Sequence, residues 1–232
     1  MMEIQKELRA RSNPEKAGVY QRFFKTGKGD YGEGDMFLGL TVPETRSIAK
    51  RYVHLGLNEI RELLKSEMHE ERLAALELLV FRYENGDGKT KEEIFNFYIE
   101  STKYINNWDL VDLSAEYVVG DYLLDKDKSV LYRLAESESL WERRIAIIST
   151  FHFIRNGKFQ YTFKIAEILL NDRHDLIHKA VGWMLREAGK RDRKAEEEFL
   201  RRHYKKMPRT MLRYAIERFP EGLRKAYLNG DV

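Results

Sequence analysis

The chain has 232 residues, of which 43% are hydrophobic and 34% are charged, and its formal net charge is +3. It contains no cysteine, which excludes disulfides, cysteine-based zinc sites and thiol catalysis. The sequence has neither a signal-peptide pattern nor an apolar run approaching the roughly 20 residues of a membrane span, so we expect a soluble, cytoplasmic protein.

Positive charge is concentrated toward the C-terminus. Residues 173–232 hold 16 Lys and Arg against 9 Asp and Glu, whereas the remainder of the chain holds 25 against 29. Such an excess suits a polyanionic partner such as a nucleic acid, although a solvated helical surface has the same composition.

Helices are predicted along almost the whole chain, because apolar residues recur at spacings of three and four and alternating strand patterns are absent. Asn13 and Pro14 begin one helix, as an N-cap and a first-turn proline, and this helix runs to about Phe24. Pro43 begins the next helix, which runs to about Val53. Further helices are predicted near residues 58–65, 68–84, 91–102, 107–120, 127–136, 140–155, 160–170, 175–189, 193–204, 209–218 and 221–228.

A glycine-rich loop is predicted between the first two of these helices, over residues 25–35. Its composition resembles a phosphate-binding loop, but it lacks the Gly-Lys-Ser/Thr ending and does not follow a strand. We therefore interpret it as a flexible surface loop. Residues 1–12, which are highly charged, are expected to cap one end of the helical array and to favour a monomer.

A four-residue pattern recurs in the longer helices: a polar or small residue, an apolar residue, a small residue, and an apolar or small residue. Successive copies are 40, 32, 36 and 33 residues apart, which is the length of two antiparallel helices with their turns. This spacing predicts an all-α fold, an α-solenoid of HEAT- or armadillo-like antiparallel helix pairs with a concave basic face, forming a single domain over residues 1–232. The copies begin at Arg72, Asp112, Arg144, Ala180 and Arg213.

Asp112 and Arg144 occupy the same position in successive copies, and Trp108 lies one helical turn before Asp112. Because equivalent positions of a solenoid face the same way, these three residues are predicted to converge on one face. A structural ion pair and a core tryptophan are the alternative interpretations. A tryptophan face attracts cations, a carboxylate stabilises an oxocarbenium-like transition state and arginine binds phosphate, so the three together suit a nucleotide with a cationic base.

At these residues the chain resembles the AlkD-like DNA alkylation repair glycosylases, a family of HEAT-like repeat proteins. The resemblance covers nearly the whole chain. The segments that carry it are Asn13-Pro14-Glu15-Lys16-Ala17, Phe37-Leu38-Gly39-Leu40 with Pro43, Trp108-Asp109-x-Val111-Asp112, Trp141-x-x-Arg144-x-Ala146-Ile147 and Lys179-Ala180-x-Gly182-Trp183-x-Leu185-Arg186-Glu187.

The resemblance implies a DNA glycosylase without metal or cofactor, which hydrolyses the N-glycosidic bond of positively charged alkylated purines (N3-methyladenine, N7-methylguanine) in duplex DNA. It implies Asp112, Trp108 and Arg144 as the catalytic residues and Trp183 as an aromatic contact of the lesion nucleotide. Phe23 stands where the family usually has a tyrosine, so the ring is kept and the hydroxyl is lost. Further basic residues expected to contact DNA are Arg143, Lys179, Arg186, Lys190 and Arg213.

Two other functions remain open at this point. A non-catalytic HEAT-repeat protein that binds DNA or RNA fits the basic C-terminal part, and a protein-interaction scaffold is the commonest use of such solenoids. His174 and His178 are four residues apart, as in a helical metal site, but no third ligand stands at a suitable spacing, so no metal site is predicted.

Overall fold

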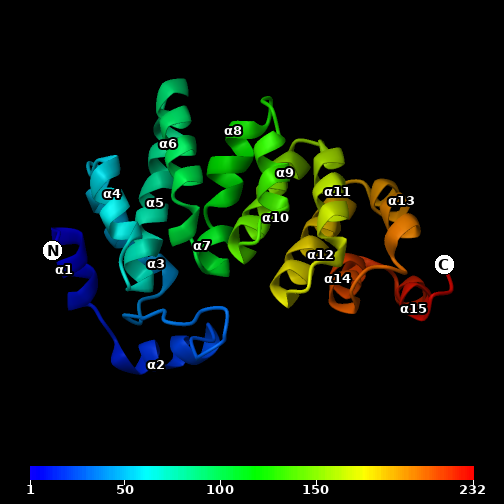
Figure 1. Cartoon of the computed structure of the whole chain (residues 1–232), viewed down its shortest axis with the longest axis horizontal. Helices are drawn as coiled ribbons and strands as arrows, with labels where there is room; N and C mark the ends of the chain where they lie inside the picture. The colour runs from blue at the N-terminus through cyan, green and yellow to red at the C-terminus, as the bar shows by residue number, and fades with distance from the viewer. The chain divides into compact units, whose positions relative to one another are not determined.

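The computed structural model describes the whole chain, residues 1–232, and helices make up most of it (Figure 1). No β-strand forms, and one isolated bridge joins Met36 to Met68. The chain divides into two compact units, Met1–Val118 and Val119–Val232, and each is described by itself. The all-α fold class is confirmed and is compatible with a helical-repeat solenoid, whereas a single continuous domain and a concave basic face stay predictions. None of the helices combines the length and the apolar character needed to cross a membrane.

The first unit contains α1 to α7. Its longest helix, α5, packs against both α3 and α4 and is buried over most of its length. The helices are α1 (Glu3–Ala10), α2 (Pro14–Phe23), α3 (Val42–Ala49), α4 (Leu57–Leu64), α5 (His69–Asn85), α6 (Gly88–Glu100) and α7 (Trp108–Asp112), with 3₁₀ turns η1 (Lys50–Tyr52) and η2 (Thr102–Tyr104).

The second unit contains the remaining helices, and its long helices α10 and α12 form its centre. α10 packs against α9, α11 and α12, and α12 packs in turn against α11, α13 and α14. This arrangement is typical of stacked helical repeats. The helices are α8 (Asp121–Leu123), α9 (Ser129–Ala135), α10 (Leu140–Arg155), α11 (Phe159–Ile168), α12 (Asp175–Gly189), α13 (Arg193–His203), α14 (Arg209–Ala215) and α15 (Glu221–Asn229), with 3₁₀ turns η4 (Leu169–Asn171) and η5 (Ile216–Arg218).

Several helices begin where the sequence predicts. The Asn13 side chain accepts a hydrogen bond from Lys16 N (3.0 Å) and caps α2. Ser139 caps α10 by accepting from Glu142 N (3.4 Å). These side chains satisfy backbone N–H groups that have no partner within the helix, which is why the helices begin there. Helix α1 lies in the N-terminal segment for which the sequence predicted only a capping role.

The segment 107–120 differs from the single helix that was predicted. Helix α7 ends at Asp112, and a turn separates it from one turn of π-helix, η3 (Glu116–Gly120). Ser114 Oγ donates to the carbonyl of Leu110 (2.6 Å), a side-chain bond of the type that bends helices. Asp112 therefore ends a short helix instead of lying in the middle of a long one.

The small residues at the third place of the repeated pattern are buried, as expected for positions where helices approach closely. The approach at Gly182 on α12 is close, since a Cβ atom there would lie 2.4 Å from the carbonyl oxygen of Met211 on α14. The buried set comprises Ala74, Ser114, Ala146, Gly182 and Ala215.

Candidate active site

Trp108 and Asp112 are the first and last residues of α7, four apart and therefore on one face of the helix. Both side chains are partly exposed. Asn107 precedes them and caps the helix, because its Oδ1 atom accepts a hydrogen bond from Trp108 N (2.8 Å). The helix thus presents an aromatic ring and, one turn later, a carboxylate.

Aromatic rings surround Trp108. Its ring stacks on Phe24, with centroids 5.2 Å apart, and the edge of Phe23 packs against it at 5.9 Å. Phe24 stacks in turn on Phe37 at 5.0 Å. Phe23 remains 60% exposed, so its ring stands next to Trp108 and is accessible to solvent.

A cluster of charged side chains lies behind this ring stack. His69 Nε2 donates to Asp109 Oδ2 (2.8 Å), and its Nδ1 faces Asp35 Oδ2 (3.4 Å). Arg72 donates to the other oxygen of Asp35 (2.6 Å). The glycine-rich loop is exposed over most of its length, but its last residue, Asp35, is buried. This cluster was not predicted from the sequence, where its only signal is that His69, Arg72 and Asp109 lie near predicted helix starts.

The pKa values of the cluster reflect the balance between burial and charge. Burial lowers the pKa of His69, but the charge of Asp109 and the hydrogen bonds that His69 donates to Asp109 and Asp35 outweigh burial and raise this pKa to about 9. Burial raises the pKa of Asp35, but its bonds to His69 and Asn107 and the charge of Arg72 hold that pKa below its ordinary value. His69 is therefore an imidazolium at neutral pH, between two carboxylates.

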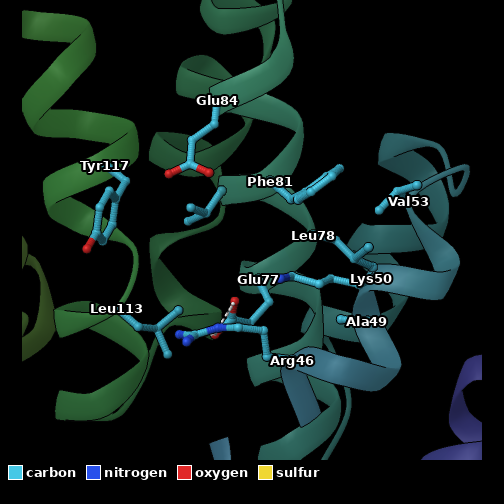
Figure 2. Close-up of a pocket in the computed structure, with 11 residues that line it drawn as sticks. Arg46, Ala49, Lys50, Val53, Glu77, Leu78, Phe81, Glu84, Leu113 and Tyr117 are labelled. Carbon is cyan, nitrogen blue, oxygen red and sulfur yellow. Dashed lines mark hydrogen bonds and ion pairs between the residues drawn. The ribbon is translucent and has the colours of Figure 1, made fainter. Parts of the chain in front are cut away.

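Two of the cavities in the first unit are lined by a residue of α7 or of the turn that follows it. The smaller has a volume of about 170 Å³ and is lined mainly by rings. The larger, about 310 Å³, contains the ion pair of Arg46 on α3 with Glu77 on α5, and Leu113 and Tyr117 also line it (Figure 2). Because Leu113 directly follows Asp112, the larger cavity lies beside the end of α7 that carries the candidate carboxylate. The rings of the smaller cavity are Tyr20, Phe23, Phe24, Phe37 and His69.

In the second unit, Arg143 and Arg144 are neighbours on α10 with different partners. Arg144 is buried and donates to the carbonyl of Leu176 at the start of α12 (2.7 Å). Arg143 donates to Asp172 Oδ2 (2.6 Å), which commits it to an internal contact. A DNA contact by Arg143 stays a prediction. The convergence of Arg144 with Asp112 also stays a prediction, since the two residues belong to different units.

Arg143 belongs to a helix-start motif that was not recognised in the sequence. Residues 66–72 and 137–143 share the pattern Ser-Glu-x-x-x-Glu-Arg. In both copies the serine hydroxyl donates to the second glutamate (2.7 Å and 2.5 Å), and the arginine donates to the serine carbonyl (2.8 Å and 2.9 Å). These contacts align Arg72 with Arg143, one residue away from the register that the four-residue pattern predicts.

Glu187 connects three of the predicted DNA-contact residues, two on α12 and one, Lys190, directly after it. The buried carboxylate accepts from the indole Nε1 of Trp183 (3.2 Å) and from Lys190 (2.6 Å), and Arg186 Nε lies 3.8 Å away. Trp183 also packs edge-on against Phe151. The orientation of the Trp183 ring is therefore held by a hydrogen bond and a ring contact within the unit.

The other predicted contacts on α12 and α14 differ in their pairing. Arg186 forms an ion pair with Glu217, and Lys179 forms one with Asp175 (2.6 Å). Arg213 on α14 is exposed. A cation that already has a carboxylate partner must give up or share that contact to bind phosphate, so Arg213 is the readiest of these residues for a DNA backbone.

The two histidines with metal-like spacing are engaged by the backbone. His174 Nδ1 accepts from Leu176 N (3.2 Å), and His178 Nε2 donates to the carbonyl of Asp172 (2.6 Å). No group of three His, Cys, Asp or Glu side chains is placed to hold a metal ion.

A family model described as DNA alkylation repair enzyme matches residues 4–219 of the chain. The chain belongs to the DNA alkylation repair enzyme family. Among solved structures it is similar to one described as "Predicted DNA alkylation repair enzyme from Enterococcus faecalis", with a TM-score of 0.71 and 16% identity over 90% of this chain and 97% of that chain. At this identity the likeness shows a shared fold. No curated protein sequence matches the chain.

Membership in the DNA alkylation repair enzyme family supports a role in DNA repair, with DNA as the partner, and the family's description is that of an enzyme. The match spans both units, so the segments that carry Trp108, Asp112, Arg144 and Trp183 all lie inside it.

Proposed function

We propose that this DNA alkylation repair enzyme is a glycosylase that hydrolyses the N-glycosidic bond of positively charged alkylated purines in duplex DNA. N3-methyladenine and N7-methylguanine are the proposed substrates. The single observation that carries the proposal is the pairing on α7 of the Trp108 ring with the Asp112 carboxylate, both partly exposed and one turn apart.

The chemistry of a cationic purine suits this pair. An alkylated purine already carries positive charge and leaves as a neutral base, so its departure needs no general acid. The electron pair of the C1′–N9 bond neutralises the departing base, and the sugar develops oxocarbenium character. Asp112 stabilises that charge and orients the water whose oxygen bonds to C1′, while the water proton passes to solvent.

The aromatic rings of the candidate site explain why a cationic base is the proposed substrate. Trp108 attracts a cationic base through its ring face, and Phe23 offers a second exposed ring beside it. In the second unit we propose Arg144 as the third catalytic residue, Trp183 as a contact of the lesion nucleotide and the exposed Arg213 as a contact of the DNA backbone. The planar guanidinium of arginine binds phosphate in a bidentate manner. A contact with the DNA backbone does not distinguish one base from another.

The decisive experiment is release of the free base from a duplex that contains N7-methylguanine, with wild-type protein beside Asp112→Asn. We expect the variant to lose release by about 100- to 1,000-fold, because the amide cannot stabilise the developing positive charge. Its affinity for the duplex, measured by fluorescence anisotropy, should be retained or slightly increased, since one negative charge is removed.

Asp125→Asn is the matched control, since Asp125 is an exposed carboxylate of the second unit that pairs with Lys158. This variant should release base at the wild-type rate. Wild-type activity in Asp112→Asn would refute the role of that carboxylate. Release by neither protein, together with salt-sensitive duplex binding by both, would identify a non-catalytic HEAT-repeat DNA-binding protein.

A further inference from the structure

The charged cluster behind Trp108 is formed by three separate segments of the first unit. Asp35 ends the glycine-rich loop, His69 and Arg72 lie in the first turn of α5, and Asp109 lies in the first turn of α7. All four side chains are at most 12% exposed. Burying four charges is costly unless each is paired and hydrogen-bonded, so the cluster needs an explanation beyond its presence at a helix start.

Asp35 is the centre of this cluster. Besides His69 and Arg72, the amide groups of Asn106 (3.3 Å) and Asn107 (3.0 Å) donate to its carboxylate oxygens. The loop end is also joined to α5 by the backbone, since His69 N donates to the carbonyl of Met36 (2.8 Å). Residues immediately before α7 are therefore tied to the end of the glycine-rich loop.

The cluster reaches Trp108 along two routes. Asn107 donates to Asp35 through its side-chain nitrogen and accepts from Trp108 N through its side-chain oxygen, so one amide connects the loop to the backbone of the ring-bearing residue. The second route passes through rings, since the centroid of the Phe24 ring lies 5.2 Å from the ring centroids of both Trp108 and His69. Both the backbone and the ring plane of Trp108 are supported from this cluster.

We propose that Asp35 and His69 are positioning residues, which hold the glycine-rich loop against the start of α7 and thereby set the orientation of Trp108 and of Asp112 one turn later. The contribution to excision rests on the proposed glycosylase function, whereas the contribution to the Trp108 geometry does not. Since a displacement of about 1 Å at a reacting centre costs about 100-fold in rate, a rigid support of this kind has a kinetic consequence.

The first unit offers a matched control for the cost of disturbing a buried charge. Glu71 lies on the same turn of α5 and is also fully buried, but it accepts from Gln5 (2.7 Å) and Arg9 (2.7 Å) of α1 and from Ser66 (2.7 Å), which precedes α5. Glu71→Gln therefore removes a buried charge of the same helix turn that is not hydrogen-bonded to Asp35, His69 or Asn107. Its one link to the cluster passes through Ser66, whose carbonyl accepts from Arg72.

The test uses full-length protein labelled with 5-fluorotryptophan, with the ¹⁹F resonance of Trp108 assigned from Trp108→Phe. Asp35→Asn and His69→Gln should each move that resonance. Each should lower the single-turnover release of N7-methylguanine by about 10- to 100-fold, with the duplex dissociation constant within about twofold of wild type. Glu71→Gln should lower the melting temperature but leave the resonance and the rate unchanged.

Three outcomes would overturn the proposal. An unmoved Trp108 resonance in both variants would show that the cluster does not support the ring. If the Trp108 resonance moves but the rate of base release is unchanged, the cluster has no kinetic role. Equal effects in Glu71→Gln would reduce the cluster to general stability. If the wild-type protein releases no base, the proposed function fails by itself. The ¹⁹F shifts then still decide whether Asp35 and His69 position Trp108. If Asp35→Asn does not fold, His69→Gln provides the same test.

Discussion

At the scale of single residues, His69 shows how a buried histidine becomes a cation at neutral pH. Its two ring nitrogens face carboxylates from different segments, Asp109 and Asp35, and Arg72 is the nearest competing positive charge. Glu70, the next residue, turns to the backbone N–H groups of Leu38, Gly39 and Leu40. The imidazolium thus has two opposite charges at hydrogen-bonding distance, and its proton is bound more tightly in the folded state than in the unfolded chain.

This linkage predicts a pH dependence of stability. Because the pKa of His69 is raised to about 9 from its ordinary value of 6.5, its contribution to the free energy of unfolding is complete below about pH 6.5 and is lost as the pH rises through about 9. Urea unfolding between about pH 6 and about pH 10 should show a steeper decline in wild type than in His69→Gln.

Two further residues make this comparison interpretable. Burial raises the pKa of Glu196 to about 8, so ionisation of that carboxyl also changes stability as the pH rises, but it does so equally in both proteins. The difference between wild type and His69→Gln therefore reports His69. A variant at the exposed His54, His54→Gln, should decline as wild type does. Parallel curves for wild type and His69→Gln would contradict the paired imidazolium.

At the scale of elements, the second unit depends on the close approach of α12 and α14. Gly182 lacks a Cβ atom at the contact, where such an atom would lie 2.4 Å from the carbonyl oxygen of Met211 and 2.5 Å from Cβ of Tyr214. Backbone cannot withdraw as a flexible side-chain end does, so a methyl group here must push the helices apart.

Gly182→Ala should therefore lower the free energy of unfolding by about 1–3 kcal/mol, even though alanine favours a helix more than glycine does. Gly222→Ala is the control, since Gly222 lies in α15 and no atom lies within 4 Å of the position that its new methyl group would take. That variant should be neutral or more stable by up to about 1 kcal/mol. Denaturant titration measures both, and equal stability of the two variants would contradict the close contact.

At the scale of the whole molecule, the two units differ in charge. The first unit holds 17 Lys and Arg against 21 Asp and Glu, whereas the second holds 24 against 17. Binding to a polyanion draws on counterion release at Lys and Arg contacts, so the second unit is expected to supply most of the salt-dependent affinity for duplex DNA. Many Lys and Arg side chains of the second unit form ion pairs, so a substitution at the exposed Arg213 tests the DNA contact most directly.

Arg213→Ala should weaken duplex binding to the same extent for alkylated and unmodified DNA, because a phosphate contact carries no base specificity. The slope of log K against log salt should become less steep by about 1. Fluorescence anisotropy at several salt concentrations measures both quantities, with Lys89→Ala on α6 of the acidic unit as the control. An unchanged slope would remove Arg213 from the phosphate contacts.

Local patterns in the sequence were sufficient to predict most of the helices, although they missed α1 and the break after Asp112. Spacings of three and four, side-chain caps such as Asn13 and Ser139, and prolines in first turns act within a few residues of one another, so they can be interpreted without tertiary contacts. The small residues of the repeated pattern and the neighbourhood of Trp108 and Asp112 on one helical face follow from the same local geometry.

The way in which those helices are joined and supported emerged from the folded chain alone. The contacts of His69 with Asp35 and Asp109 link residues 34 and 40 positions apart, and no local pattern specifies such pairs. The same holds for Arg143, whose partner Asp172 lies 29 residues away and which the sequence predicted only as a DNA contact. Burial made the difference in each case, because a charge removed from water must find a partner wherever the folded chain supplies one.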